Sequence, residues 1–275
     1  MKYKSVSKFI GTRLLHISMM ACSPKADKIT ILHTNDTHSQ IEPIEMGKRD
    51  ANHAGYARRM GLIQQERLNN PNVIVVDAGD FCQGTPYFNF YHGRVEIDAF
   101  NRMGYDAVTL GNHEFDNGVD TLAQILKEAN FAVVSANYDV KDTPLEGIVQ
   151  PYTIVTRAGV RVGILGVGIN PEGLIATKNF EPVRYNEPIN AAQKVATELK
   201  TKHKCDVVVC LSHLGTNADE VLAQETKNID VIIGAHTHKV VANHYVKNQE
   251  GDTVLLAQMG KSGARMGKIT LKIKE

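Results

Sequence analysis

AVTLGNHEFD, at residues 107–116, joins a short run of strand-forming residues to a group of side chains that can bind metals. The same arrangement occurs at four other places. KITILHT at 28–34 runs into NDTH, VIVV at 73–76 runs into DAGD, and two later apolar runs lead into SH at 212–213 and GAHTH at 234–238. Ligands of open α/β sheets bind beyond the carboxyl ends of the strands. We therefore expect the five clusters to converge on one site.

Apolar runs alternate with helical patterns along the rest of the chain. Helical spacing recurs around 122–129 and 192–199, more weakly at 56–63, and Pro188 suits a first helical turn. Ala158-Gly159 is a plausible hairpin turn. The pattern predicts an α/β domain with some antiparallel pairing late in the chain. The predicted strands are 28–34, 73–76, 107–110, 131–135, 152–157, 160–168, 206–211, 229–233, 253–258 and 268–273.

Composition excludes some classes of protein. The 275 residues carry a net charge of +1, with no basic stripe, so we expect no nucleic-acid polymer as partner. No apolar run reaches the length of about 18 residues that a membrane-spanning helix needs. Cys205 and Cys210 flank one strand too long for a disulfide between them, so a disulfide framework is not expected.

The first 22 residues differ from the rest. A basic start, MKYKSVSK, is followed by a mostly apolar stretch and then Ala21-Cys22. This resembles a bacterial lipoprotein signal, although Arg13 and His16 interrupt the apolar run. We expect residues 1–27 to be a leader and linker, residues 28–275 to be a catalytic domain, and Cys22 to carry a lipid tether. The protein would then be exported, periplasmic or anchored to the cell envelope. A disordered terminus or misassigned start, with a cytoplasmic protein, is the alternative.

The clusters share one chemistry. Carboxylate, imidazole and amide oxygen together suit divalent zinc, manganese or iron, and the set is too rich in oxygen for a structural zinc site. It is also too large for one ion, so a shared carboxylate would divide it between two. The seven candidate ligands are Asp36, His38, Asp80, Asn112, His213, His236 and His238.

These motifs in this order resemble the calcineurin-type metallophosphoesterases. HTNDTH at 33–38, GDFCQGTP at 79–86 and GNHEFD at 111–116 resemble the 5′-nucleotidase branch of that family. The resemblance implies a β-sandwich of mixed sheets flanked by helices, in four layers α/β/β/α. It also implies that His113 lies beside the phosphate and that Asp116 orients it. One metal would be held by Asp36, His38, Asp80 and His238, and the other by Asp80, Asn112, His213 and His236.

The resemblance further implies hydrolysis of phosphate monoesters, most plainly nucleotides, by water activated between two ions. Cyclic-nucleotide phosphodiesterase or nucleotide-sugar pyrophosphatase activity is the alternative, because the pocket outside the metal core selects the ester. A non-enzymatic metal-binding subunit or scaffold is a third interpretation. Full-length nucleotidases of the family carry a C-terminal nucleotide-binding domain that this sequence lacks, so a separate chain carrying it is an expected partner.

Five further features have structural interpretations. We expect His33 to be a hydrogen-bonded core histidine and Cys82 a packed thiol. Asp77 and Glu114 are expected to support the ligands rather than to do chemistry. The aromatic residues at 87–91 are expected to pack into the core at the start of a helix, with base stacking as the alternative.

Overall fold

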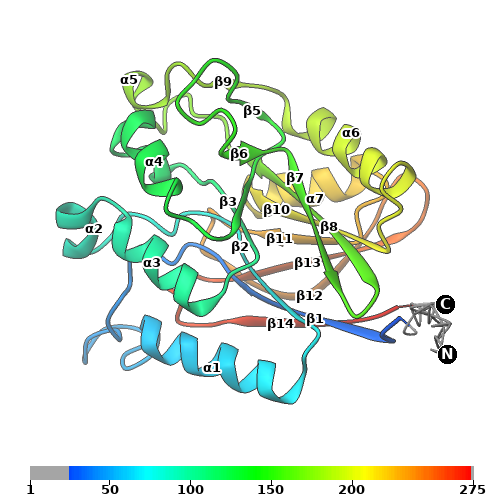
Figure 1. Cartoon of the computed structure of the whole chain (residues 1–275), viewed down its shortest axis with the longest axis horizontal. Helices are drawn as coiled ribbons and strands as arrows, with labels where there is room; N and C mark the ends of the chain where they lie inside the picture. Colours follow the sequence, from blue (N-terminus) through cyan, green and yellow to red (C-terminus); the bar gives the residue numbers. More distant parts are fainter. Residues whose placement is uncertain (1–24, 274–275) are drawn as a thin grey trace, which may run out of the picture.

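Two six-stranded sheets form the framework of the computed structural model, which describes residues 25–273 (Figure 1). In spatial order, the first sheet contains β14 (Gly267–Lys272), β1 (Lys28–Thr34), β2 (Val73–Asp77), β3 (Ala107–Thr109), β4 (Ala132–Val134) and β6 (Val149–Gln150). The second contains β12 (Val240–Lys247), β13 (Thr253–Met259), β11 (Val231–Gly234), β10 (Val207–His213), β8 (Val160–Gly168) and β7 (Tyr152–Arg157). A small ribbon pairs β5 (Tyr138–Asp139) with β9 (Arg184–Tyr185).

The central strands of both sheets run parallel. β1 to β4 pair in parallel, as do β8, β10, β11 and β13, and their β-branched residues are buried on both faces. Antiparallel strands occupy three of the edges: β14 beside β1, β12 beside β13, and β7 beside β8. The β7–β8 turn is the hairpin expected at Ala158-Gly159, with φ of 43° and 79°.

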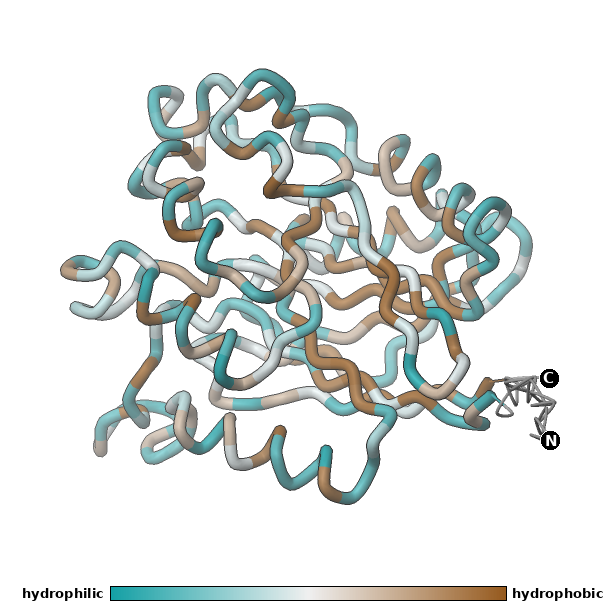
Figure 2. Tube along the Cα trace, viewed as in Figure 1, coloured by the Kyte–Doolittle hydropathy of each residue, from teal (hydrophilic) through white to brown (hydrophobic). Residues whose placement is uncertain are grey.

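Apolar side chains form three layers of packing. One lies between the two sheets and includes Ile31, Ile74, Ile164 and Val209. The outer face of the first sheet is covered by α1 (Tyr56–Asn69), α3 (Arg94–Met103) and α4 (Gly118–Leu126). The outer face of the second is covered by α6 (Pro188–Thr201) and α7 (Thr216–Glu225). The predicted four-layer α/β/β/α sandwich of mixed sheets is confirmed, and Figure 2 shows its hydrophobic residues concentrated along the central strands.

Short elements connect these layers. They are α2 (Pro86–Tyr91), η1 (His113–Phe115) and α5 (Thr177–Phe180). Among the described residues, none of the helices combines the length and the hydrophobicity of a membrane-spanning segment. Cys82, Cys205 and Cys210 are free and buried, as expected for Cys82, whereas Cys22 lies outside the described residues, as does most of the predicted leader.

Two expectations need correction. The aromatic cluster is not core as a whole: Phe88 is buried, but Phe90 is 77% and Tyr91 53% exposed, because the short α2 turns only one face inward. His33 is buried in β1, as expected, but its Nδ1 has no hydrogen-bond partner among the described residues, so it is not fully satisfied.

Candidate metal centre

The five predicted clusters meet at the carboxyl ends of β1, β2, β3, β10 and β11. Ligand-type atoms lie within 4.8 Å of one another in three overlapping groups, and Asp80 and His38 each belong to two of them. The remaining candidate, Asn112, joins through its Oδ1, which lies 3.1 Å from Nδ1 of His236. The structure therefore brings all seven predicted ligands together, with His113 beside them. The groups are Asp36 with His38 and His238, Asp80 with His213 and His236, and His38 with Asp80 and His113.

An unusual backbone presents five of the seven side chains. Asp36, His38, Asp80, His236 and His238 all have left-handed φ angles, between 45° and 69°. Each such residue costs about 1–3 kcal/mol when it is not glycine, and such residues persist where the surrounding structure enforces them. In each loop this conformation turns the chain sharply just beyond its strand. Asp36 and His38 consequently share one group of facing atoms, whereas His236 and His238 belong to two different groups of the cluster.

His213 is oriented as a metal ligand would be. Its Nδ1 donates a hydrogen bond to the carbonyl oxygen of Ala78 at 2.8 Å, which leaves Nε2 facing the cluster. That Nε2 is fully buried, lies 3.1 Å from Oδ2 of Asp80 and makes no well-formed hydrogen bond. A second ring nitrogen bonded to a backbone carbonyl is the usual support of a metal-binding histidine.

Other nitrogens and oxygens of the cluster also face one another. Nε2 of His38 lies 2.9 Å from Nε2 of His238. Nε2 of His238 in turn lies 3.6 Å from Oδ1 of Asp36. Two imidazole nitrogens and a carboxylate oxygen turned to one point form a donor set for a borderline divalent cation. The residues present thus fit the pair of ions that the sequence predicts.

The electrostatics of the site favour a bound cation. Burial raises the pKa of Asp36 to about 7 and lowers the pKa of His38 to about 4. Burial acts against charge on His213 and Asp80 too, but their mutual attraction raises the pKa of His213 to about 10 and holds that of Asp80 below its usual range. Neutral imidazoles beside buried carboxylates are what a divalent ion requires, and such an ion would balance Asp80 in place of the proton on His213.

Two glycines leave room for the ligands. A Cβ on Gly111 would collide with Oδ1 of Asp80 and would lie 2.6 Å from Cε1 of His213. A Cβ on Gly79 would lie 2.9 Å from Nδ1 of His213. Only glycine therefore allows the backbone after β2 and β3 to approach the cluster so closely.

Hydrogen bonds from one predicted ligand, His236, and from two residues outside the predicted set, Asn35 and Ser262, fix Asp36. Asn35 donates its Nδ2 to Oδ2 at 2.6 Å, and the amide of His236 donates to Oδ1 at 2.9 Å. The carbonyl of Asp36 accepts the amide of Ser262 at 2.6 Å. Asn35 could have been suspected from its place in HTNDTH, whereas Ser262 acts through its backbone and has no sequence signature. Asp77 supports its turn as expected, accepting the amide of Gly79 at 2.9 Å.

His113 and Asp116 form a pair at the edge of the cluster. Nδ1 of His113 lies 2.9 Å from Oδ2 of Asp116, and this hydrogen bond raises the pKa of His113 although partial burial opposes it. Both side chains are about one-third exposed, at 31% and 35%. The ring of His113 also makes a T-shaped contact with that of His38, with the two ring centroids 5.4 Å apart.

Comparison with known proteins places this geometry in a family. Residues 29–240 match the calcineurin-like phosphoesterase family. The chain is 34% identical to a snake venom 5′-nucleotidase of Gloydius brevicauda over 87% of this chain and 44% of that protein. It is 35% identical, with a TM-score of 0.81, to the solved 5′-nucleotidase precursor of Thermus thermophilus, covering 90% of this chain and 52% of the other. The solved NAD nucleotidase of Haemophilus influenzae is 27% identical, with a TM-score of 0.80, covering 89% of this chain and 53% of the other.

The chain spans about half the length of these relatives. The match to the family model covers all five clusters and the strands of both sheets from β1 to β11. On this basis, the chain is a member of the calcineurin-like phosphoesterase family.

Proposed function

We propose that this protein hydrolyses phosphate monoesters with two divalent metal ions, and that nucleotides are the leading substrates. The observation that carries the proposal is the convergence of seven ligand-type side chains, five of them on left-handed backbone, at one end of the paired sheets. Membership of the calcineurin-like phosphoesterase family and the resemblance to 5′-nucleotidases support the same reaction.

The ligands would divide into two sets that share Asp80. Asp36, His38, Asp80 and His238 would hold one ion, and Asp80, Asn112, His213 and His236 the other. Support comes from two separate groups of facing atoms, one with Asp36, His38 and His238 and one with Asp80, His213 and His236. A third group links them, because it contains both His38 and Asp80. Two ions bound there would activate the attacking water and neutralise charge on the phosphoryl oxygens. Zinc and manganese suit these ligands best, and iron is also compatible.

His113 would act on the phosphoryl group itself. The hydrogen bond with Asp116 raises the pKa of His113, which favours the doubly protonated ring more than in a free imidazole. It could donate a hydrogen bond to a phosphoryl oxygen or give its proton to the leaving alkoxide. Asp116 would hold the ring in the orientation that either role needs.

The same ligands could support the hydrolysis of other phosphate esters, so phosphodiesterase and pyrophosphatase activity remain alternative proposals. A phosphodiesterase or a pyrophosphatase acting on nucleotide-sugars would use the same ligands with a different surrounding pocket. The similarity to a NAD nucleotidase keeps the pyrophosphatase alternative in view. A metal-binding subunit without activity would bind ions but hydrolyse none of these esters.

Location and partners are proposed on narrower grounds. Residues 28–275 would form one catalytic domain, supported by the pairing of β14 with β1 across the ends of that range. Export with a lipid tether at Cys22 rests on the basic and apolar leader alone. A separate chain carrying a nucleotide-binding domain remains a proposal that rests on the resemblance to the nucleotidase branch alone.

Metal reconstitution with a substrate panel tests the proposal. Purified protein is stripped with a chelator, reconstituted with zinc or manganese, and assayed on AMP, cyclic AMP, a nucleotide-sugar and an aryl phosphate. We expect about two ions per chain and hydrolysis of the monoesters that is lost again on chelation. Fewer than about one bound ion per chain, or hydrolysis that persists without metal, would contradict it.

A further inference from the structure

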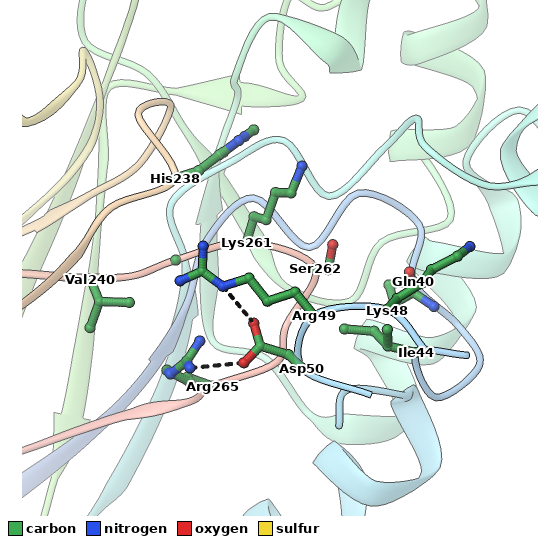
Figure 3. A pocket seen from close by; sticks show the side chains of 11 residues that line it. Gln40, Ile44, Lys48, Arg49, Asp50, His238, Val240, Lys261, Ser262 and Arg265 are labelled. Atoms are coloured by element: carbon green, nitrogen blue, oxygen red, sulfur yellow. Dashed lines mark hydrogen bonds and ion pairs between the residues drawn. The ribbon is translucent and has the colours of Figure 1, made fainter. Parts of the chain in front are cut away.

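A cavity of about 380 Å³ opens beside the metal centre and is not used by the mechanism above (Figure 3). It lies between the loop at 40–50 that follows β1 and the turn at 260–265 that joins β13 to β14. His238 forms part of its wall, so the cavity shares a residue with the proposed ligand set. Anything bound in it would therefore lie next to a phosphoryl group held at the ions.

The lining of this cavity is strongly basic. Four cationic side chains, Lys48, Arg49, Lys261 and Arg265, face one carboxylate, Asp50. Asp50 is already committed to Arg265, at 2.9 Å, and lies 3.9 Å from Arg49.

Lys261 lines the cavity together with His238, and Figure 3 shows the two side chains on the same side of it. Within residues 25–273 the ammonium of Lys261 makes no ion pair and no hydrogen bond. Lys48, in contrast, is paired with Glu45 on the outer side of its loop at 2.8 Å. Among the described residues, Lys261 is thus the one cation of the lining without an ion pair, while Arg49 and Arg265 share the single carboxylate of Asp50.

The turn that carries Lys261 is tied to the proposed metal-binding loop. Asn35 donates its Nδ2 to the carbonyl of Gly260 at 2.8 Å, and Ser262 donates its amide to the carbonyl of Asp36 at 2.6 Å. Beneath the turn, Gly263 lies directly against the buried guanidinium of Arg59. The backbone that carries Lys261 is consequently fixed relative to the loop of Asp36, which helps to preorganise a subsite there.

The chemistry of the lining selects an anion over a nucleobase. None of the lining residues is Phe, Tyr or Trp, and the only large apolar side chains are Ile44 and Val240. A base platform would need an aromatic face, whereas lysine and arginine beside a phosphoryl site suit a second phosphate.

We propose that this cavity binds a second phosphoryl group of the substrate, so that the substrate class is phosphate esters with two phosphoryl groups, such as nucleoside diphosphates. The inference rests on the proposed hydrolysis at the neighbouring ions and narrows its substrate. Lys261 and Arg49 would make the charged contacts, and Arg265 with Asp50 would keep the loop at 40–50 and the turn at 260–265 together.

Kinetics on the full chain test the substrate assignment. The ratio of kcat/KM for ADP to that for AMP is measured in the wild type and in Lys261→Gln, Arg49→Gln and Lys127→Gln. Lys127 is an exposed lysine outside the cavity, so its substitution removes the same charge as a control. We expect the ratio to fall roughly tenfold to a hundredfold in the two cavity variants and to stay unchanged in the control. An equal ratio in all four proteins would overturn the proposal.

A binding measurement separates this inference from the proposed function. Inorganic pyrophosphate is titrated by calorimetry into chelator-treated protein, where no hydrolysis occurs. We expect the wild type and Lys127→Gln to bind it and Lys261→Gln to bind it at least about tenfold more weakly. If neither nucleotide is hydrolysed but this pattern holds, the proposed function fails while the anion site stands. No binding, or equal binding by Lys261→Gln and Lys127→Gln, would overturn the anion site.

Discussion

The carboxylate of Glu114 accepts a hydrogen bond from the backbone amide of Asp80, with 2.9 Å between Oε2 and the nitrogen. The same oxygen accepts the amide of Gly111 at 2.6 Å, and Oε1 accepts the amide of Cys82 at 3.0 Å. One buried side chain therefore joins the loop after β2 to the loop after β3. This connection sets where Asp80 and Asn112 lie relative to each other.

Glu114→Gln should loosen that connection with almost no change in shape. A glutamine has one oxygen for three amide donors, and its own NH₂ must then face at least one of them. We expect the free energy of unfolding to fall by about 1–3 kcal/mol, with weaker metal binding. Urea unfolding and metal analysis measure both effects, and Glu128→Gln on the exposed surface serves as the control. A variant that matches the wild type in both measurements would contradict this role.

Gly111→Ala should disturb the metal centre by contact alone. Its backbone lies outside the left-handed region, so the added methyl brings no conformational strain, but it would press on Asp80 and His213. We expect metal affinity to fall at least about tenfold, as it does when support of a ligand is lost.

Gly61→Ala is the matched control for this substitution. It places the same methyl in open space on α1, where it should stabilise the protein by about 0.5–1 kcal/mol. Competition of each variant with a metal indicator measures the affinity. Equal affinity in the two variants would show that Gly111 is not needed for the centre.

The sequence predicted the long strands well because burial on both faces makes them continuous apolar runs. β2, β8 and β10 differ from the predicted ranges by at most two residues at either end. β12 has no such signal, since most of its side chains are exposed and a register shift near Asn243, with φ of 54°, interrupts the alternation. β5, β6 and β9 have two residues each and are defined only by their partners. The expected helical patterns also omit α3 and α7.

For the candidate site, too, some features could be predicted from the sequence and others could not. That seven side chains would share one end of the sheets could be predicted, because each follows a strand and parallel strands end at one edge. That they bind metals stays a prediction. The surrounding support could not be read from the sequence: the amide of Ser262 on Asp36, and Lys261 beside His238, come from a turn more than 220 residues away from the first cluster.

His113 and Asp116 should act as one unit in turnover. His113→Ala should lower kcat by roughly 10²–10⁴ without changing the number of bound ions. Asp116→Asn should cost less, because the ring remains but loses the partner that orients it. If Asp116 acts only through His113, the double variant should be no slower than His113→Ala alone.

Steady-state kinetics with metal analysis measure the three variants. Loss of an ion from His113→Ala would instead identify His113 as a ligand, in line with its place in the group that contains His38 and Asp80. Fully additive losses in the double variant would mean that Asp116 has a role of its own.

His33 should make the fold sensitive to acid. It is 1% exposed in β1, its ring fills the space over Gly267 of β14, and burial lowers its pKa from 6.5 to about 4. The unfolded chain therefore binds this proton more readily than the folded chain does. Protonation of His33 does not contribute above pH 6.5, and it makes the free energy of unfolding fall progressively as the pH drops from 6.5 to about 4.

The loss attributable to His33 should reach about 2–3 kcal/mol at pH 4.5. Urea unfolding at pH 7 and pH 4.5, with chelator present so that metal release does not contribute, measures it in the wild type, His33→Gln and His33→Leu. Either variant should lose less stability between these two pH values than the wild type, because neither side chain takes up a proton there. His53→Gln, at an exposed histidine, should keep the wild-type difference. If both His33 variants lose as much stability as the wild type, acid destabilises the fold through other groups. Protonation of the buried His33 ring in β1 would then not be the cause.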